Sequence, residues 1–215
     1  NTTYGQSIVS YDGTSSNATV GHGLSSAPEV VLVMNRERAH NPSMWHTSIP
    51  NTHYLHLDGT AASASNTAYW NSTSPTNQVF TVGTSNDINA NNEGHIAYCF
   101  HSVSGYSSFG TYDGTGSAGK AVTTGFRPAW VMVKRIDAVE NWCIFDNARS
   151  PFNPVVRRFR ADLPNAEDVE TGTNNTLNFT DTGFTWLGTG GGTNNGSGTY
   201  VYMAFAGGAD SVSDY

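Results

Sequence analysis

The chain has 215 residues, a formal net charge of −7 and only 13% charged residues. An acidic chain without a large basic face does not suit nucleic-acid binding, and no apolar run approaches the roughly 20 residues that cross a membrane as a helix. Aromatic residues make up 12% of the chain, too many for a disordered segment, and the wealth of Ser, Thr, Asn and Gly favours a turn-rich β protein.

Short runs of β-branched and aromatic residues, separated by Gly, Asn, Ser and Pro, predict strands along the chain. In chain order the expected strands cover residues 30–36, 43–49, 53–58, 78–83, 95–101, 129–135, 141–146, 177–187 and 199–206. Helix-compatible sequence is confined to residues 60–70 and 162–170, which stand at matching places in the two halves. The sequence therefore predicts an all-β fold with at most two short helices.

Internal repetition is the most informative feature. The sequence YDGT occurs at Tyr11–Thr14 and again at Tyr112–Thr115, and a proline precedes a strand at Pro28 and at Pro128. Three further landmarks recur in the same order about 100 residues apart, namely Trp45 with Trp142, Phe80 with Phe184, and Phe100 with Phe205. This regularity predicts a duplication, with one repeat over about residues 11–110 and a second over about 111–208.

Two related halves of this size can share one sandwich or form two small side-by-side domains. Each half has few strands and would leave much apolar edge exposed if it stood alone. We therefore expect residues 1–215 to form a single compact double-repeat unit, an antiparallel β-sandwich of the jelly-roll kind.

Few charged or reactive side chains stand out. Cys99 and Cys143 each lie in an apolar run, which favours two buried free thiols over a disulfide. A basic cluster at Arg157, Arg158 and Arg160 lies beside several carboxylates between residues 162 and 170. We interpret this cluster as a local patch of ion pairs, because one cluster is a small electrostatic footprint in an acidic chain.

No cofactor or metal is expected. His46, His53 and His56 lie close in sequence, and packing between strands is favoured over the alternative of a metal on an oligomer axis. The Asp and Asn residues from Asp87 onward alternate like Ca²⁺ ligands, but they lack the glycine and the closing glutamate of a calcium hand, so only a looser loop site stays open.

Nothing in the sequence predicts an enzyme. Residues 114–121 nearly match the phosphate-binding loop pattern, but Ala121 replaces the hydroxyl residue that would hold Mg²⁺. The G-x-S-x-G elbow of serine hydrolases is absent from the sequence. The chain has several carboxylates, but the sequence alone does not bring two of them together as a glycosidase requires.

Several segments together resemble a known family. TGFRPAWVMVKR, NWCIFDNAR and GTYVYMAFAG resemble a β-rich domain repeated in structural proteins of tailed phages, many from marine hosts, and HGLSSAPEVVLVMNR resembles its upstream copy. The resemblance covers roughly residues 11–208. It implies a virion context, in proteins such as tail fibres, and a β-sandwich, and it carries over no catalytic or ligand-binding residue.

Sugar binding requires exposed aromatic faces that stack on C–H surfaces, with amide or carboxylate groups nearby for the hydroxyls. Tyr69, Trp70 and Asn71 in the first half and Trp186 in the second match that chemistry. The competing interpretation places these rings in the core, as expected for the tryptophans at strand positions. The binding hypothesis therefore requires Trp70 or Trp186 to be exposed.

These observations lead to one expectation and two alternatives. We expect a structural module of a virion surface (a tail fibre, spike or head decoration) that attaches to a host-surface glycan. Its partners would be copies of itself, as a homotrimer or other homo-oligomer, and other virion proteins, with no nucleic acid and no membrane insertion. The alternatives are a purely architectural capsid-decoration or fibril-forming surface protein, and a bacterial cell-surface glycan-binding module.

Overall fold

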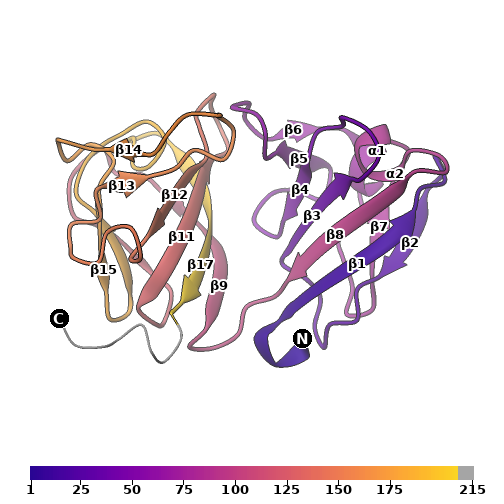
Figure 1. Ribbon diagram of the computed structural model, residues 1–215, viewed down its shortest axis with the longest axis horizontal. Helices are drawn as coiled ribbons and strands as arrows, with labels where there is room; N and C mark the ends of the chain where they lie inside the picture. The colour runs from indigo at the N-terminus through magenta and orange to yellow at the C-terminus, as the bar shows by residue number, and fades with distance from the viewer. Residues whose placement is uncertain (208–215) are drawn as a thin grey trace. The chain divides into compact units, whose positions relative to one another are not determined.

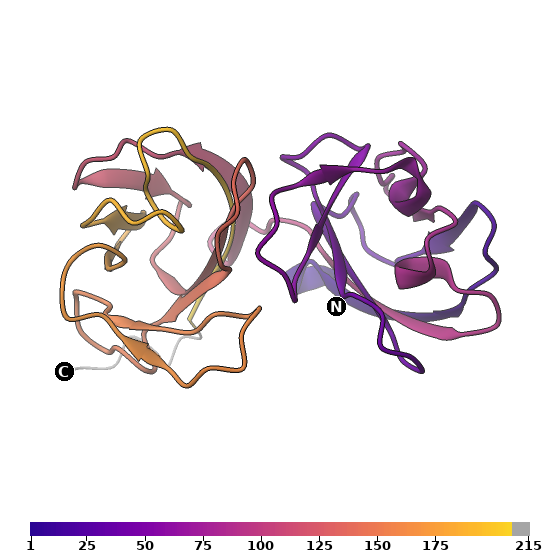
Figure 2. The ribbon, with the colours of Figure 1, turned by 90° about the horizontal axis from the view of Figure 1, so that it is seen from above.

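A computed structural model describes residues 1–207 and divides the chain into two compact units, unit 1 (residues 1–103) and unit 2 (residues 104–215) (Figures 1 and 2). Both units consist of antiparallel sheets with very little helix, so the predicted all-β, sandwich-like fold is confirmed. Among the described residues no helix is long and apolar enough to span a membrane.

Unit 1 combines a six-stranded sheet with a two-stranded one. The larger sheet has the order β1 (Gln6–Asp12), β8 (Gly94–Phe100), β3 (Val30–Asn35), β4 (Ser43–His46), β5 (His53–His56) and β6 (Ala64–Ser65). The smaller sheet pairs β2 (Ala18–Gly21) with β7 (Val79–Val82). A 3-10 turn, η1 (Thr2–Tyr4), precedes β1, and two single-turn helices, α1 (Thr67–Trp70) and α2 (Asn86–Asn89), flank β7 in the chain.

Unit 2 has a four-stranded, a three-stranded and a two-stranded sheet. The first has the order β12 (Cys143–Asp146), β11 (Pro128–Arg135), β17 (Thr199–Ala206) and β9 (Ser107–Asp113). The second has the order β10 (Lys120–Thr123), β16 (Gly183–Trp186) and β15 (Leu177–Thr180). The third pairs β13 (Arg157–Arg158) with β14 (Asp168–Val169).

The two units share one strand order. β1-β8-β3-β4 in unit 1 matches β9-β17-β11-β12 in unit 2, and the pair β2-β7 matches β10-β16. Such repetition is what the predicted duplication requires. The register, however, places Trp45 opposite Val31 and Phe145 opposite Val131, so the equivalent of Trp45 is Phe145. The sequence-based match of Trp45 with Trp142 was wrong by three residues, because Trp142 lies just before β12, whereas Trp45 lies within β4.

Each unit has its own hydrophobic core. Alternating residues of the central strands point inward and meet the second sheet: Val31 packs in one cluster with Phe80, and Val131 in another with Phe184 and Trp186. Within residues 1–207 strands pair only inside their own unit. This strand pairing is what the alternative of two small domains predicts, since no sheet contains strands of both halves. The expectation that residues 1–215 form a single compact unit stays a prediction.

A buried asparagine fixes each YDGT turn. In unit 1, Asn89 is 1% exposed; its Oδ1 accepts from the Thr14 backbone N–H at 2.8 Å, and its Nδ2 donates to the carbonyls of Ser16 and Gly83 at 2.7 and 2.5 Å. Because all three partners are backbone groups, one side chain satisfies polar atoms of two separate loops.

Asn194 repeats this arrangement in unit 2. It is 0% exposed, accepts from the Thr115 N–H at 2.8 Å and donates to the carbonyls of Ser117 and Gly188 at 2.8 Å each. The tyrosine of each motif also donates to a carbonyl of the loop that carries the asparagine, at 2.6 Å in both units. The repeated sequence motif therefore encodes a repeated hydrogen-bond network.

Most predicted strands are present within a few residues. The run 177–187 is a hairpin of β15 and β16, since the turn at Asp181 interrupts it. The helix expected over 162–170 is wrong: that segment is irregular and ends in β14, while a helix that was not predicted, α2, forms where Ser85 caps it through the Asp87 N–H. Strands β1, β2, β9 and β10 were also missed, because their polar exposed faces weaken the apolar signal. Cys99 and Cys143 are buried free thiols, as predicted.

Candidate functional site

The aromatic side chains selected from the sequence lie where a sugar cannot reach them. Trp70, Trp186 and Tyr69 are 2%, 0% and 6% exposed, and all three rings belong to the hydrophobic cores or their edges. A buried indole offers no face for stacking on a sugar. The condition that Trp70 or Trp186 be exposed is therefore not met, and the rings stabilise the cores by burying apolar area.

Asn71 is the one exposed member of that set. It ends α1 with a left-handed backbone (φ 48°), and its Oδ1 accepts a hydrogen bond from Asn17 Nδ2 at 3.1 Å. Asparagine is common at this position because it tolerates the left-handed conformation. Its contacts are those of a helix cap.

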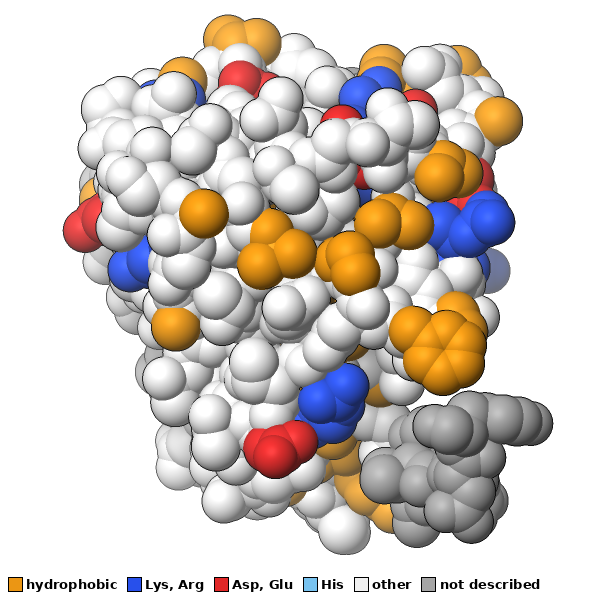
Figure 3. Space-filling model, turned by 90° about the vertical axis from the view of Figure 1, so that its left-hand side faces the viewer, with side chains coloured by type: hydrophobic (Ala, Val, Ile, Leu, Met, Phe, Trp, Pro, Cys, Tyr) orange, Lys and Arg blue, Asp and Glu red, His pale blue; other side chains and the backbone are white. Residues whose placement is uncertain are grey.

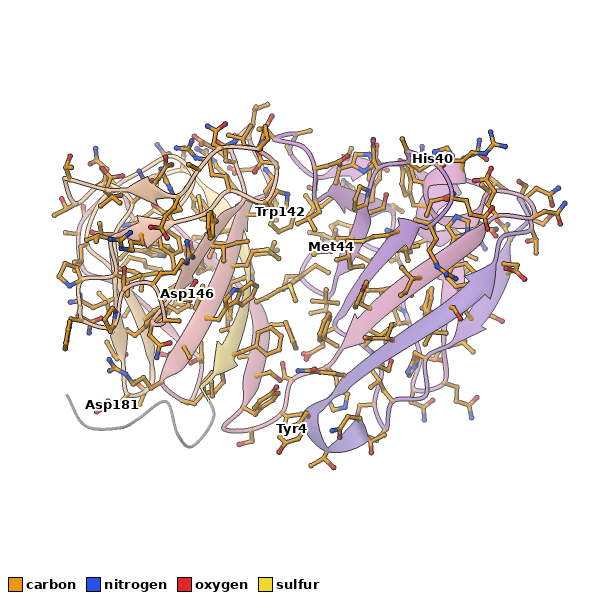
Figure 4. All side chains as sticks on the ribbon, viewed as in Figure 1. Tyr4, His40, Met44, Trp142, Asp146 and Asp181 are labelled. Atoms are coloured by element: carbon orange, nitrogen blue, oxygen red, sulfur yellow. The ribbon has the colours of Figure 1, made fainter. Side chains whose placement is uncertain are left out.

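A polar pocket of about 170 Å³ opens instead in unit 2, beside the start of β12. It is lined by Glu140, Asn141, Cys143, Arg158, Arg160, Asn175, Gly191 and Gly192. These residues come from the β11–β12 loop, from β12, from β13 and the loop after it, and from the loops before β15 and before β17. In Figure 4 the label Trp142 marks the residue just before β12, and the label Asp146 marks the last residue of that strand.

The basic side of the pocket consists of two arginines. Arg158 and Arg160 both pair with Asp168, at N···O distances of 3.1 and 2.8 Å. Arg158 is 8% exposed, and its Nε–H is buried without an acceptor among residues 1–207. Leaving a buried donor unpaired costs about 1–3 kcal/mol, so an acceptor bound here would be stabilised.

The acidic side is Glu140. A Cβ built on Gly191 would lie 2.0 Å from Glu140 Oε1, so the carboxylate rests on backbone that only a glycine leaves open. Within the described part of the chain this carboxylate accepts no hydrogen bond and forms no ion pair, although its charge acts on Lys134 and Arg135 nearby. The pocket therefore offers an unpaired acceptor as well as an unpaired donor.

Burial shifts the titration of two neighbouring groups. It raises the pKa of the Cys143 thiol to about 11, against the opposing effect of Arg158, whose Nη1 lies 3.9 Å from the sulfur. It lowers the pKa of Lys134 to about 8, and the Lys134 ammonium donates to the carbonyls of Arg135 and Glu140 at 2.8 Å each. Because a protonated thiol is a poor nucleophile, the pocket favours binding over thiol chemistry.

The repeat allows this pocket to be compared with the same place in unit 1. Matching strand registers and matching loop hydrogen bonds, such as Ser85 N–H to the Ala68 carbonyl and Gly190 N–H to the Asn174 carbonyl, align the two sites. The equivalent residues, with unit 2 first, are Gly192 and Asp87, Arg158 and Tyr54, Arg160 and His56, and Glu140 and His40. The segment that carries Asn174 and Asn175 corresponds to the one that carries Ala68 and Tyr69.

In unit 1 large side chains fill this place. Tyr69 Oη donates to Asp87 Oδ2 at 2.5 Å, and the Tyr69 ring stacks on Tyr54 with a centroid distance of 3.7 Å. His40, labelled in Figure 4, and His56 lie 3.5 and 4.0 Å from the same carboxylate. Unit 2 carries Gly192 where unit 1 carries Asp87, and asparagines in the segment where unit 1 carries Tyr69, so smaller side chains line this place in unit 2.

A second hollow in unit 2, of about 230 Å³, is less suited to a ligand. Its one charged lining residue, Arg127, already pairs with Asp181 at 3.7 Å, and the hollow extends to Gly207, the last described residue. Figure 3 shows a side of unit 2 on which apolar side chains are scattered among backbone and uncharged polar atoms, with few charged groups. We therefore base the candidate site on the smaller pocket.

Residues 1–208 match a protein family described as a domain of unknown function, DUF7483. The chain belongs to that family. No curated protein matches the chain, and neither does any solved structure. The pocket is thus the feature of this DUF7483 chain from which a function can be inferred.

The histidines considered as metal ligands have other partners. His46 Nδ1 accepts from the Ser48 N–H at 3.1 Å, His53 Nδ1 lies 2.9 Å from Thr52 Oγ1, and His56 Nδ1 lies 3.3 Å from Ser43 Oγ. Among residues 1–207 no group of three or more His, Cys, Asp or Glu side chains is arranged to hold a metal ion.

Two sequence signals could have pointed to the pocket. The basic cluster was interpreted only as ion pairs, which it does form, with Arg157 bound to Glu167 and Arg160 to Asp168. The run Gly190–Gly192 stands where unit 1 has Ser, Asn and Asp. An alignment of the two halves would have shown both differences, glycines in unit 2 where unit 1 has polar side chains and arginines in unit 2 where unit 1 has Tyr54 and His56.

Proposed function

We propose that this chain is a structural module of a virion surface that contributes to attachment by binding a host-surface glycan. The observation that carries the attachment role is the pocket of unit 2, with a buried unpaired guanidinium N–H from Arg158 and an unpaired carboxylate from Glu140. The sequence resemblance to repeated domains of tail-fibre proteins supports the virion context and an extracellular location.

The pocket's size and chemistry suit a terminal sugar. A cavity of about 150 Å³ accommodates benzene, so a pocket of about 170 Å³ admits a single six-membered ring. Sugar hydroxyls both donate and accept, and the wall offers partners of both kinds. Larger drug-like ligands need pockets of about 300 Å³ or more.

Binding at one such site is expected to be weak, because no aromatic ring lines the pocket to stack on a sugar. Display on a homo-oligomer, such as a trimer, would compensate, since avidity can add about 10²–10⁴ to the apparent affinity. The partners are then copies of the chain, other virion proteins and the glycan.

Arg160→Gln tests the proposal, with Arg157→Gln as the matched control. Each change removes one ion pair of the same cluster, but only Arg160 lines the pocket. On a glycan array and on whole cells, we expect the native chain and Arg157→Gln to bind saturably and Arg160→Gln to bind at least about tenfold more weakly. Absence of binding by a folded native oligomer would contradict the attachment role.

A purely architectural role is the second candidate, favoured by exposed apolar side chains. Phe152, Val169 and Phe159 are 64%, 52% and 41% exposed on unit 2, and Ile8 on the edge strand β1 is 67% exposed. Apolar side chains near unpaired strand edges can support lateral association. Phe152→Ser would then reduce oligomer size in light scattering, whereas the attachment role alone predicts no change.

A further inference from the structure

The charge of the pocket distinguishes between classes of sugar. The charged residues that line the pocket or contact its lining carry both signs. The positive ones are Arg158, Arg160 and Lys134, and the negative ones are Glu140, Asp162, Asp168 and Glu170. A carboxylated, sulfated or phosphorylated ligand would have to displace or face carboxylates already present, and like charges at short range destabilise one another. A cationic ligand would meet the same problem at the two guanidinium groups.

The hydrogen-bonding atoms that remain free narrow the choice further. The amide of Asn141 already donates to Asp162 Oδ2 at 2.6 Å, and that of Asn175 donates to Glu170 Oε2 at 3.0 Å. Each of these amides is held by that bond and keeps one further N–H. The charged groups that line the pocket are the Glu140 carboxylate, which can only accept, and guanidinium N–H groups, which can only donate. One hydroxyl of a ligand can donate to the first and a neighbouring hydroxyl can accept from the second.

We propose that the unit 2 pocket binds the neutral terminal monosaccharide of a glycan through two adjacent hydroxyls, one donating to Glu140 and one accepting from the guanidinium of Arg158 or Arg160. This inference rests on the proposed attachment function and adds the class of sugar. A vicinal diol satisfies the unpaired Nε–H and the unpaired carboxylate at once without adding charge. Ligands that lack a donor, or that carry a negative charge, satisfy only one of the two.

The open floor of the pocket fits the same assignment. Gly191 and Gly192 carry no side chains, and a Cβ on Gly192 would lie 3.3 Å from Cys143 Sγ and 3.6 Å from Glu140 Oε2. Unit 1 has Asp87 at the equivalent position, where it accepts the Tyr69 hydroxyl. Unit 1 thus provides its own hydroxyl and carboxylate at the place where unit 2 leaves the carboxylate of Glu140 for a ligand.

Glu140→Gln tests the ligand class, because the amide keeps the size of the side chain but loses the charge and one acceptor. Glu167→Gln is the matched control, since Glu167 pairs with Arg149 and Arg157 outside the pocket. The probes are glycans that end in neutral hexoses, and the same glycans ending in carboxylated or sulfated sugars, immobilised on one array. Thermal unfolding of each variant establishes that it is folded.

We expect the native chain and Glu167→Gln to bind neutral termini, and Glu140→Gln to bind them about tenfold more weakly, as loss of a charge-assisted hydrogen bond implies. Binding confined to charged termini, or binding of neutral termini that Glu140→Gln leaves unchanged, would overturn the inference but keep the attachment function. Binding to no terminus by the folded native chain would overturn both.

Discussion

Units 1 and 2 share one frame, by which we mean the strand order and the buried asparagine, but they differ in the side chains at one corner, next to the asparagine. Both have the same order of four strands, both stack the YDGT tyrosine on an aromatic ring, His95 in unit 1 and Tyr200 in unit 2, and both fix the turn with a buried asparagine. In unit 1 the corner next to the asparagine loop holds a Tyr–Asp–His cluster. In unit 2 it holds glycines, arginines and a pocket. Comparing two units of one strand order separates the residues that both units share from those that differ between them.

The strongest test of the shared frame is to remove its asparagines. Asn194→Ala leaves the Thr115 N–H and the carbonyls of Ser117 and Gly188 without their partner. The bond to the Gly188 carbonyl is buried, and an unsatisfied buried group costs about 1–3 kcal/mol, whereas Thr115 and Ser117 are exposed. We therefore expect a loss of roughly 3 kcal/mol in the free energy of unfolding. Asn89→Ala should have a similar effect in unit 1.

Hydrogen exchange measured by mass spectrometry locates these effects. Because the cores are separate, Asn89→Ala should accelerate exchange in residues 1–103 and Asn194→Ala in the described residues from 104 on. Asn91→Ala, an exposed position two residues after Asn89, serves as control and should change little. Equal acceleration in both units by either variant would contradict the independence of the two cores.

The glycine of the YDGT turn is the next most sensitive position. A Cβ at Gly13 would lie 2.0 Å from the Ala90 carbonyl oxygen, and one at Gly114 would lie 2.1 Å from that of Asn195. Backbone must shift to admit it, so Gly13→Ala should lower the free energy of unfolding by about 3 kcal/mol. In Gly21→Ala the nearest atom is 3.9 Å away, and urea titration should show nearly native stability for this control.

Alkaline pH should distinguish the units through Lys134, whose equivalent in unit 1 is Met34. Burial lowers the folded pKa of Lys134 to about 8, below the value of about 10.4 in unfolded chains. The unfolded chain therefore binds more protons between these values, and stability rises with pH there. Compared with Lys134→Met, the native chain should gain about 2–3 kcal/mol between pH 8 and 10. The pKa of Cys143 is raised in the folded chain, so its contribution to stability falls as the pH rises through the pKa of the unfolded thiol. Both proteins contain Cys143, so this loss cancels when they are compared. Parallel stability curves for the two proteins would contradict this assignment.

Thiol labelling gives the smallest effect. Burial raises the pKa of Cys99 to about 12 and that of Cys143 to about 11, so both thiols stay protonated at neutral pH. Cys143 lines the pocket, and iodoacetamide at pH 8 should modify it faster than Cys99, by roughly tenfold if reactivity follows the thiolate fraction. A sugar that occupies the pocket should slow Cys143 alone, which peptide mass mapping can measure.

Much of the fold was predictable because apolar alternation and punctuation by Gly and Pro are local. The polar strands β1 and β9 were not predictable, since the polar residues on their exposed faces resemble loop sequence. Their strand conformation depends on pairing with β8 and β17. For the same reason Trp70 and Trp186 were misjudged: composition marks them as suitable for stacking on sugar, but burial depends on the second sheet. The pocket depends on residues from four segments, and only the repeat, aligned by structure, shows that its side chains differ from those of unit 1.

The most direct test of the central claim is to fill the pocket with the residue of unit 1. Asn175→Tyr places a tyrosine ring, as carried by the corresponding segment of unit 1, at a residue that lines the pocket. Asn174→Tyr, one residue earlier, exposed and outside the lining, is the matched control. With both variants folded, glycan binding should disappear in Asn175→Tyr and persist in Asn174→Tyr. Full glycan binding by Asn175→Tyr would show that the pocket opened in unit 2 is not the binding site.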